Sequence, residues 1–204
     1  GEDERETLVF RSDSNDLPRA KGAEIGRILH REGLRYEYID FVCNTVGTPL
    51  DGLRIIYDGA NGAAYQVGPE ILERLGAVIL PTHVLPDGIN INEKCGSTHL
   101  DSLRASVVAN RADVGIANDG DADRCLLVDE KGNVLDGDRI MLLCALHLKQ
   151  QGRLKDNMIV GTVMSNIGFH KAAQELGMQT CITGVGDRYV LEKMREKGYS
   201  LGGE

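Results

Sequence analysis

Short apolar runs alternate with amphipathic segments along most of this chain, and this alternation restricts the possible folds more than any other feature. Runs such as LRIIY at 53–57 and MIVGTV at 158–163 have the length and the branched residues of β-strands. Strands that are separated by helices form βαβ units, whose sheets are mainly parallel. The predicted fold class is therefore α/β, with two consecutive domains that have mainly parallel mixed sheets, the second of them incomplete.

The same patterns place the individual elements. Strands are expected at 53–57, 77–80, 113–117, 125–128, 134–135, 158–163 and 179–183, with another where the chain stops at 200–204. Helices are expected at 23–46, around 71–75, at 100–108 behind a Thr98/Asp101 capping box, at 136–150 behind Asp136 or Asp138, at 166–176 and at 189–196. Residues 1–22 are expected to be a tail or linker, 23–152 the first domain and 153–204 the second.

Composition excludes several functions. The net charge is −8 and no cluster of Lys or Arg stands out, so nucleic acid is not an expected partner. No apolar run approaches the ~20 residues of a membrane span, and the first residues are too charged for a signal peptide. We expect a protein of the cytoplasm without a membrane partner. The five cysteines form no CxxC pair, which predicts reduced thiols, mostly in apolar surroundings.

The most informative segment is NDGDADR at 118–124, which lies between two predicted strands. Asp119, Asp121 and Asp123 bring three negative charges into five positions, and these repel one another unless a cation lies among them. The small residues between them leave the backbone free to curve around one point. Oxygen ligands of this kind select a hard cation such as Mg²⁺. Arg124 follows directly, where its guanidinium can bind a phosphate in bidentate fashion.

The segment also fits three other interpretations. It could be a solvated acidic turn. It could be an EF-hand, because Asp119, Asp121, Asp123 and Glu130 fall at loop positions 1, 3, 5 and 12, although Arg124 stands where the motif requires glycine and the flanks are predicted strands. It could also be the Asp-x-Asp loop of a haloacid-dehalogenase-like phosphatase with Asp119 as the nucleophile. That class favours Thr or Val where this chain has Asp123.

The segment DGDADR at 119–124 resembles the metal-binding loop of the α-D-phosphohexomutase superfamily. Further segments are similar to the branch of this superfamily that acts on glucosamine phosphates: DGININ at 87–92 with CGSTH at 95–99, TVMSN at 162–166 and VGDRYV at 185–190. The final GGE at 202–204 resembles the start of the sugar-binding loop of the superfamily. The resemblance covers 17–204 in unbroken order. Ala122 departs from it, because glycine is commoner at that position.

This resemblance implies an enzyme that interconverts glucosamine 6-phosphate and glucosamine 1-phosphate through a phosphoserine and a 1,6-bisphosphate. Full-length members have four domains, and the chain would hold the end of the first, all of the second and most of the third. It contains neither an S-H-N-P phosphoserine segment nor a fourth domain, so we expect no turnover by the chain alone. The alternatives are a phosphomannomutase or phosphoglucomutase of the same superfamily, and a non-catalytic module that binds a metal or a sugar phosphate.

The resemblance also implies roles for single residues. Asp119, Asp121 and Asp123 would bind Mg²⁺, and Arg124 would be the catalytic residue that steadies the transferred phosphate. Glu204, Gly186, Asp187 and Arg188 would bind the substrate, a small-molecule sugar phosphate. Simpler interpretations exist for some of them: Asp187 could be a helix N-cap, and 97–99 could be explained by helix capping. The histidines at 30, 83, 147 and 170 show no ligand spacing and are interpreted as structural, and the oligomeric state is not predicted.

Overall fold

The computed structural model describes residues 20–31 and 33–204, and it divides the chain into two compact units, 1–36 and 37–204. The described part of the first unit contains a short 3₁₀ helix, η1 (Gly22–Glu24), and the start of helix α2 (Gly33–Thr45). Most of the predicted tail lies outside the described residues.

The predicted helix over 23–46 is wrong in its first half. Gly33 begins α2 instead of interrupting a longer helix. The side chains of Ile25, Ile28 and Leu29 are exposed, so within the described residues no apolar surface covers this segment as it would cover a packed helix. Short helices depend on such packing for their stability.

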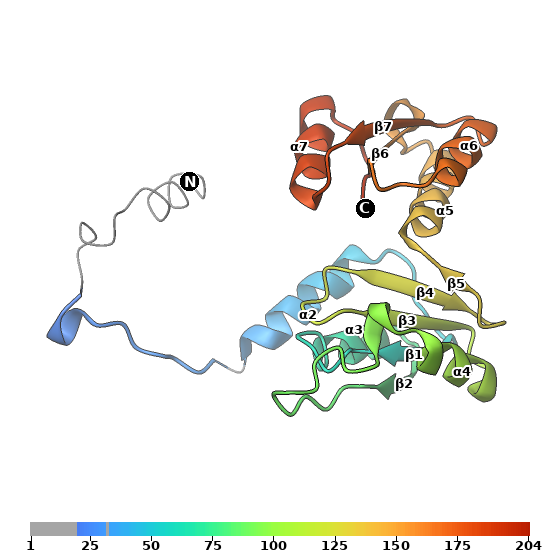
Figure 1. The fold of residues 1–204 in the computed structure, drawn as a ribbon. Helices are drawn as coiled ribbons and strands as arrows, with labels where there is room; N and C mark the ends of the chain where they lie inside the picture. The colour runs from blue at the N-terminus through green and yellow to red at the C-terminus, as the bar shows by residue number, and fades with distance from the viewer. Residues whose placement is uncertain (1–19, 32) are drawn as a thin grey trace. The chain divides into compact units, whose positions relative to one another are not determined.

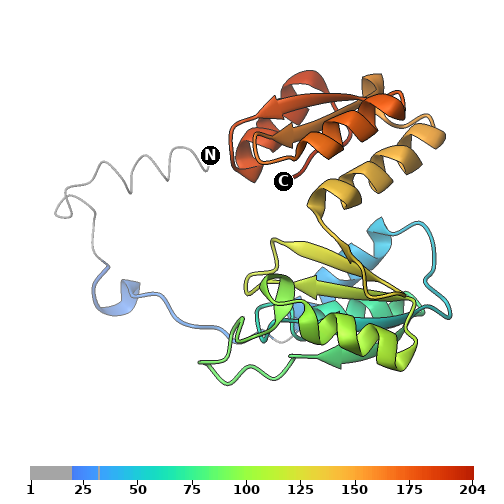
Figure 2. The same ribbon diagram turned by 45° about the vertical axis from the view of Figure 1, so that its right-hand side comes forward.

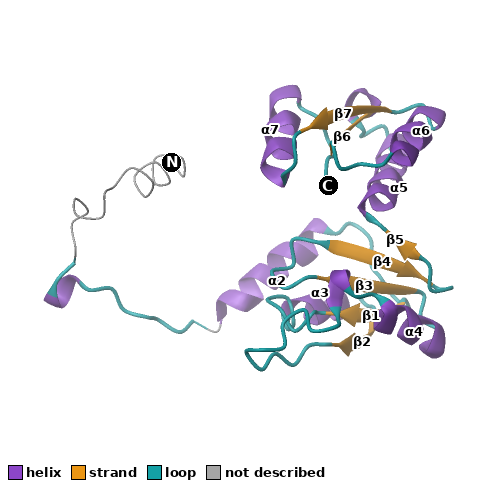
Figure 3. Ribbon diagram, in the orientation of Figure 1, coloured by secondary structure: helices purple, strands orange, loops and turns teal. Residues whose placement is uncertain are grey.

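The larger unit contains a five-stranded sheet in the order β2-β1-β3-β4-β5 (Figures 1 and 3). The strands are β1 (Arg54–Asp58), β2 (Val78–Thr82), β3 (Val114–Asn118), β4 (Cys125–Asp129) and β5 (Val134–Leu135). Strand β1 pairs in parallel with β2 and β3, whereas β4 pairs antiparallel with both β3 and β5. The last pair between β3 and β4 joins Asn118 to Cys125, so residues 119–124 connect the two strands of this hairpin. They are called the acidic loop, or acidic segment, below.

Helices cover both faces of this sheet (Figure 1). Helix α4 (Asp101–Asn110) packs on one face, and α2 and α3 (Val67–Arg74) lie on the other. The core under α4 consists of Ile56, Leu103, Val107, Ala112, Ala117 and Val128, all nearly inaccessible to solvent. This core packs against β3, and the acidic segment begins directly after the end of that strand.

A smaller parallel sheet follows, made of β6 (Met158–Thr162) and β7 (Gln179–Thr183). Helices α5 (Gly137–Gln150) and α6 (Ile167–Glu175) pack on one side of it and α7 (Asp187–Lys197) on the other, as Figure 2 shows. The second core consists of Met141, Ala145, Leu154, Ile159, Phe169, Ala173 and Met178. The strand expected at 200–204 is present only as a single parallel bridge between Val160 and Gly202.

The ends of the helices test the predicted caps. Asp136 caps α5 by accepting a hydrogen bond from the Arg139 amide, as predicted. The Thr98/Asp101 capping box is wrong, because α4 begins at Asp101 behind Leu100 and has no side-chain cap. The Thr98 hydroxyl instead donates to the Cys95 carbonyl at 3.4 Å, within the 3₁₀ turn η2 (Gly96–Thr98).

The predicted fold class is confirmed: two α/β parts follow one another, and the larger sheet is mixed. All five cysteines are free thiols, as expected. Their surroundings differ from the prediction, because Cys125 and Cys144 are exposed and only Cys95 is buried. Among the residues that the structure describes, no helix is both long enough and apolar enough to cross a membrane.

Candidate functional site

The structure brings the three predicted carboxylates together in the β3–β4 connection. Asp119 directly follows β3 and is about nine-tenths buried, at 9% exposure, whereas Asp121 and Asp123 are exposed. One carboxylate oxygen from each of the three lies within 4.8 Å of the others. Such a set of oxygen ligands suits a hard divalent cation.

Backbone conformation and local hydrogen bonds produce this arrangement. Ala122 adopts a left-handed conformation with φ of 66°, and its amide donates to the Asp119 carbonyl at 3.2 Å. The Arg124 amide donates to Asp119 Oδ1 at 3.1 Å, and Asn118 Nδ2 donates to the Arg124 carbonyl at 2.8 Å. The Tyr57 hydroxyl in turn donates to Asn118 Oδ1 at 2.9 Å. The loop is therefore closed at its base, with the carboxylates at its tip.

The charges of the loop repel one another. The pKa of Asp123 is raised from its usual value, chiefly by the negative charge of Asp121 and further by desolvation and by Asp119; Arg124 opposes this effect. A raised carboxyl pKa means that the folded protein disfavours the third negative charge. A bound divalent cation would remove this penalty, so the residues present fit a metal ion.

Arg124 keeps its guanidinium accessible. Its Nε lies 3.8 Å from Asp119 Oδ2, and the side chain is 70% exposed. An ion pair of this length at the surface holds the side chain only weakly. The guanidinium can therefore turn toward a phosphate group beside the carboxylates.

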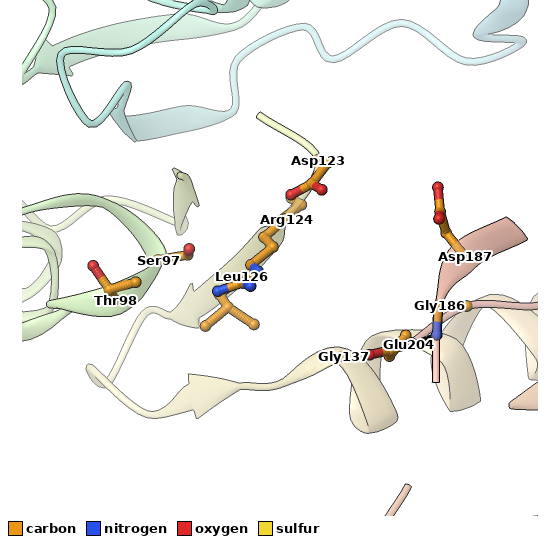
Figure 4. A pocket seen from close by; sticks show the side chains of 11 residues that line it. Ser97, Thr98, Asp123, Arg124, Leu126, Gly137, Gly186, Asp187 and Glu204 are labelled. Carbon is orange, nitrogen blue, oxygen red and sulfur yellow. Dashed lines mark hydrogen bonds between the residues drawn. The ribbon is translucent and has the colours of Figure 1, made fainter. Parts of the chain in front are cut away.

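A cavity of about 600 Å³ lies beside this loop, within the unit 37–204 (Figure 4). Asp123 and Arg124 form one wall together with residues of η2. Gly186, Asp187 and Glu204 form the opposite wall, at the start of α7 and the end of the chain. This volume is typical of small-molecule sites. The cavity therefore joins five of the eight predicted site residues, although they lie far apart in the sequence.

A hydrogen bond links two residues of the wall that Gly186, Asp187 and Glu204 form. The Gly186 amide donates to Glu204 Oε2 at 2.8 Å. Gly186, with φ of 125°, is the N-cap residue of α7, and the helix has no side-chain cap. The alternative in which Asp187 is the N-cap is therefore wrong; its carboxylate accepts from the Arg188 amide at 2.8 Å.

Three predicted residues do not line the cavity: Asp119, Asp121 and Arg188. The two aspartates belong to the carboxylate cluster beside it. Arg188 lies on the first turn of α7, and its Nε donates to Glu192 Oε1 at 3.0 Å. The structure therefore gives Arg188 a partner along its own helix.

The sequence interpretation missed Ser97 and Thr98, which line the cavity opposite Glu204. Helix capping was the explanation offered for them, but they cap no helix in the structure. The Ser97 hydroxyl is buried without a hydrogen-bond partner. The sequence signal that could have found them is Gly96, which directly precedes them. In the structure Gly96 packs closely against the end of β3, because a β-carbon there would lie 2.5 Å from the Asn118 carbonyl oxygen.

Comparison with known proteins agrees with this architecture. Residues 36–132 match the description of phosphoglucomutase/phosphomannomutase α/β/α domain II, and residues 136–204 match α/β/α domain III of the same family. The chain belongs to the phosphoglucomutase/phosphomannomutase family. Membership of this family, together with the strands that flank the acidic loop, shows that the EF-hand and haloacid-dehalogenase interpretations are wrong.

Relatives within the phosphoglucomutase/phosphomannomutase family are similar over the whole chain. A phosphoglucosamine mutase from Caldicellulosiruptor bescii is 52% identical over 204 residues, which are 100% of this chain and 45% of the relative. One from Desulforamulus reducens is 53% identical over 192 residues, 94% of this chain and 43% of the relative. The chain thus spans less than half the length of these curated relatives.

Solved structures of the family share the fold. A phosphoglucomutase/phosphomannomutase family protein from Burkholderia thailandensis has a TM-score of 0.73 at 24% identity, over 84% of this chain and 37% of that one. An N-acetylglucosamine-phosphate mutase of the α-D-phosphohexomutase superfamily has a TM-score of 0.59 at 19% identity, over 83% of this chain and 39% of that one. At these identities the likeness concerns the fold alone.

Proposed function

We propose that this chain forms the metal-binding and sugar-recognition parts of a phosphoglucosamine mutase, which interconverts glucosamine 6-phosphate and glucosamine 1-phosphate. The observation that carries the proposal is the 52% identity to the Caldicellulosiruptor bescii phosphoglucosamine mutase, which extends over all 204 residues. The cavity between the acidic loop and Glu204 supports it, because a sugar phosphate needs a cationic partner at one end and a hydrogen-bond acceptor at the other.

Asp119, Asp121 and Asp123 are the proposed ligands of Mg²⁺. Their oxygens converge, and the raised pKa of Asp123 indicates a repulsion that a divalent cation would relieve. When bound, Mg²⁺ neutralises the charge of phosphate oxygens and so favours phosphoryl transfer. The Arg124 amide donates to the Asp119 carboxylate and the Ala122 amide donates to the Asp119 carbonyl, and these bonds hold the loop in the curved form that this role requires.

Arg124 is the proposed catalytic residue. Its exposed guanidinium would bind the phosphate by two parallel hydrogen bonds and balance its charge as the phosphoryl group moves. Glu204 is the proposed sugar-binding residue. The Gly186 amide holds Glu204 Oε2, which leaves the second carboxylate oxygen to accept hydrogen bonds from sugar hydroxyls. Gly186 and Asp187 shape this wall, and Arg188 is a further proposed substrate ligand on the same helix.

In the proposed reaction a phosphoserine of the whole protein donates its phosphoryl group to the sugar phosphate. The resulting 1,6-bisphosphate turns round in the cavity and returns its other phosphate. The residues of this chain would contribute position and charge: one wall holds the phosphate that is transferred, and the other holds the hydroxyls of the ring. Orientation and electrostatic stabilisation are the main sources of catalysis in phosphoryl transfer.

Isothermal titration calorimetry tests the binding part of this proposal. With Mg²⁺ present, glucosamine 6-phosphate should bind more tightly than mannose 6-phosphate or glucose 6-phosphate. Arg124→Ala should weaken this binding, whereas Arg195→Ala, in the last turn of α7, should not. Preferred binding of mannose 6-phosphate or glucose 6-phosphate would instead favour a phosphomannomutase or a phosphoglucomutase. A coupled assay of the complete gene product would then measure the mutase activity itself.

The domain division at residues 152 and 153 stays a prediction. Helix α5 favours a different boundary, because its Met141 and Ala145 pack with Ile159 and Phe169 of the smaller sheet. We propose that the second domain begins near residue 136. Limited proteolysis between residues 132 and 136 would then release two fragments, with α5 on the second.

A further inference from the structure

A second cluster of side chains with potential metal ligands lies at the carboxyl ends of β1 and β2 in the larger sheet and has no part in the proposed reaction. It consists of Asp58, the last residue of β1, His83, which follows β2, and Cys95, which precedes η2. One ligand atom from each of these residues lies within 4.8 Å of the others. The three residues are called the Asp58 cluster below.

Two members of the Asp58 cluster are fully buried: Asp58 and Cys95 are both at 0% exposure. Asp58 Oδ1 accepts a hydrogen bond from the Ala60 amide at 2.9 Å, and Oδ2 accepts one from the Gly96 amide at 3.0 Å. These bonds fix the carboxylate, and each oxygen keeps a further lone pair. Both of these amide donors are neutral, and a buried carboxylate favours a cationic partner.

His83 supplies the independent observation. Its backbone is left-handed, with φ of 51°, which is uncommon for a residue other than glycine. Its Nδ1 lies 3.1 Å from Asp58 Oδ2, is buried, and has no hydrogen-bond partner. Buried polar atoms in folded proteins nearly always have a partner. Here Nδ1 lies at ion-pair distance from the Asp58 carboxylate without the geometry of a hydrogen bond, and a ring nitrogen of His83 lies within 4.8 Å of the ligand atoms of Asp58 and Cys95.

We propose that Asp58, His83 and Cys95 bind a divalent cation of the Zn²⁺ type. Imidazole nitrogen, thiolate sulfur and carboxylate oxygen are the donors that Zn²⁺ takes in proteins, and sulfur disfavours Mg²⁺. The thiol proton of Cys95 leaves to solvent on binding. The thiolate and the carboxylate then balance the two positive charges of the ion. With three protein ligands, the fourth tetrahedral position is open for water.

The ion would tie the chain between His83 and Cys95 to the end of β1. Backbone bonds already join these segments: the Asn61 amide donates to the His83 carbonyl at 2.6 Å, and the Asn92 amide donates to the Ala60 carbonyl at 2.9 Å. A bound cation adds a link between side chains at the same place. It should therefore stabilise the folded protein, independently of any sugar phosphate.

Cobalt titration of the full chain tests this proposal. Co²⁺ replaces Zn²⁺ in such sites, and a thiolate ligand gives a near-ultraviolet charge-transfer absorption. Excess Mg²⁺ in the buffer occupies the acidic loop. We expect this absorption to saturate at one Co²⁺ for each chain and to disappear on addition of Zn²⁺. Cys95→Ser should abolish it, whereas Cys43→Ser should retain it, because Cys43 donates to the Ile71 carbonyl outside the cluster.

His83→Gln provides the second test and does not depend on the tolerance of the core at Cys95. The His83 side chain is 29% exposed, so the substitution should leave the fold intact by circular dichroism. Co²⁺ should then bind roughly a hundredfold more weakly, because loss of a direct ligand costs at least as much as loss of the residues that support one. Absence of the thiolate absorption in the unmodified chain, or the same Co²⁺ affinity in His83→Gln, would overturn the proposal.

Discussion

Gly62 and Gly120 are in backbone contact: a β-carbon at Gly62 would lie 2.2 Å from the carbonyl oxygen of Gly120 and 2.7 Å from its α-carbon. The neighbouring Ala63 amide donates to the same carbonyl oxygen at 2.8 Å. The turn that follows β1 therefore packs directly against the backbone of the acidic loop. The position of the carboxylates depends on a glycine almost sixty residues earlier in the chain.

Gly62→Ala should disturb the acidic loop. The new methyl group would meet backbone atoms, which cannot rotate away, so we expect a loss of about 1–3 kcal/mol of unfolding free energy, the usual cost of overpacking. Urea unfolding measures this loss, and calorimetry should show weaker Mg²⁺ binding. Gly47→Ala is the matched control, since a β-carbon there meets nothing within 4 Å. Equal Mg²⁺ affinity in both variants would contradict this account.

The contact between Gly62 and Gly120 could not be predicted from the sequence, because it joins segments that are distant in the chain. The acidic loop was predictable because its charges are adjacent in the chain and the flanking runs have the pattern of strands. The segment from Asp58 to Gly62 offers no such signal, since nothing local in the sequence indicates that Gly62 touches Gly120. For the same reason His83 was interpreted as structural. Its neighbours Asp58 and Cys95 come from other segments.

The secondary structure was predictable where the pattern was supported by burial. Helices α5 and α6 begin behind Asp136 and Asn166, whose side chains accept from Arg139 and Phe169 amides. The prediction failed for residues 25–31, where the apolar residues at helical spacing are exposed and cover no core among the described residues. It also failed at Thr98, where the capping pattern is present but the hydroxyl bonds within a 3₁₀ turn instead.

Asp121→Asn should change the pH dependence of stability in metal-free buffer. The negative charge of Asp121 is the main cause of the raised pKa of Asp123, so the folded protein holds that proton more tightly than the unfolded chain. The resulting destabilisation is absent below the usual carboxyl value of 3.8 and is complete above the raised pKa. The substitution removes most of it.

Urea unfolding at a series of pH values measures this effect. The stability of Asp121→Asn relative to the unmodified protein should increase as the pH rises through the carboxyl range. Excess Mg²⁺ should reverse the order, because the ion stabilises only the protein with all three carboxylates. A difference that stays constant with pH would show that the repulsion does not act. Asp101→Asn, on the exposed start of α4, is the control.

Ala122→Gly should stabilise the protein. Ala122 has φ of 66°, a conformation that glycine adopts without strain and alanine does not. Relief of this strain exceeds the added freedom of the unfolded chain, so the expected gain is about 0.5–1 kcal/mol. Thermal and urea unfolding measure it. Ala63→Gly, at an exposed position without a left-handed backbone, should lower stability instead; a loss in both variants would show that Ala122 is unstrained.

Glu204→Gln should separate the structural role of Glu204 from its proposed role in binding. The glutamine carbonyl can still accept the hydrogen bond from the Gly186 amide, so the thermal midpoint should change little. The negative charge is lost, and hydrogen bonds to charged groups are stronger than neutral ones by an amount that corresponds to a roughly tenfold change in affinity. Calorimetry with glucosamine 6-phosphate and Mg²⁺ should show this weakening. Glu192→Gln is the control, because that carboxylate pairs with Arg188 along α7 and does not line the cavity. If both variants bind the sugar phosphate as the unmodified chain does, Glu204 is not a sugar ligand, and its bond to Gly186 only orders the end of the chain.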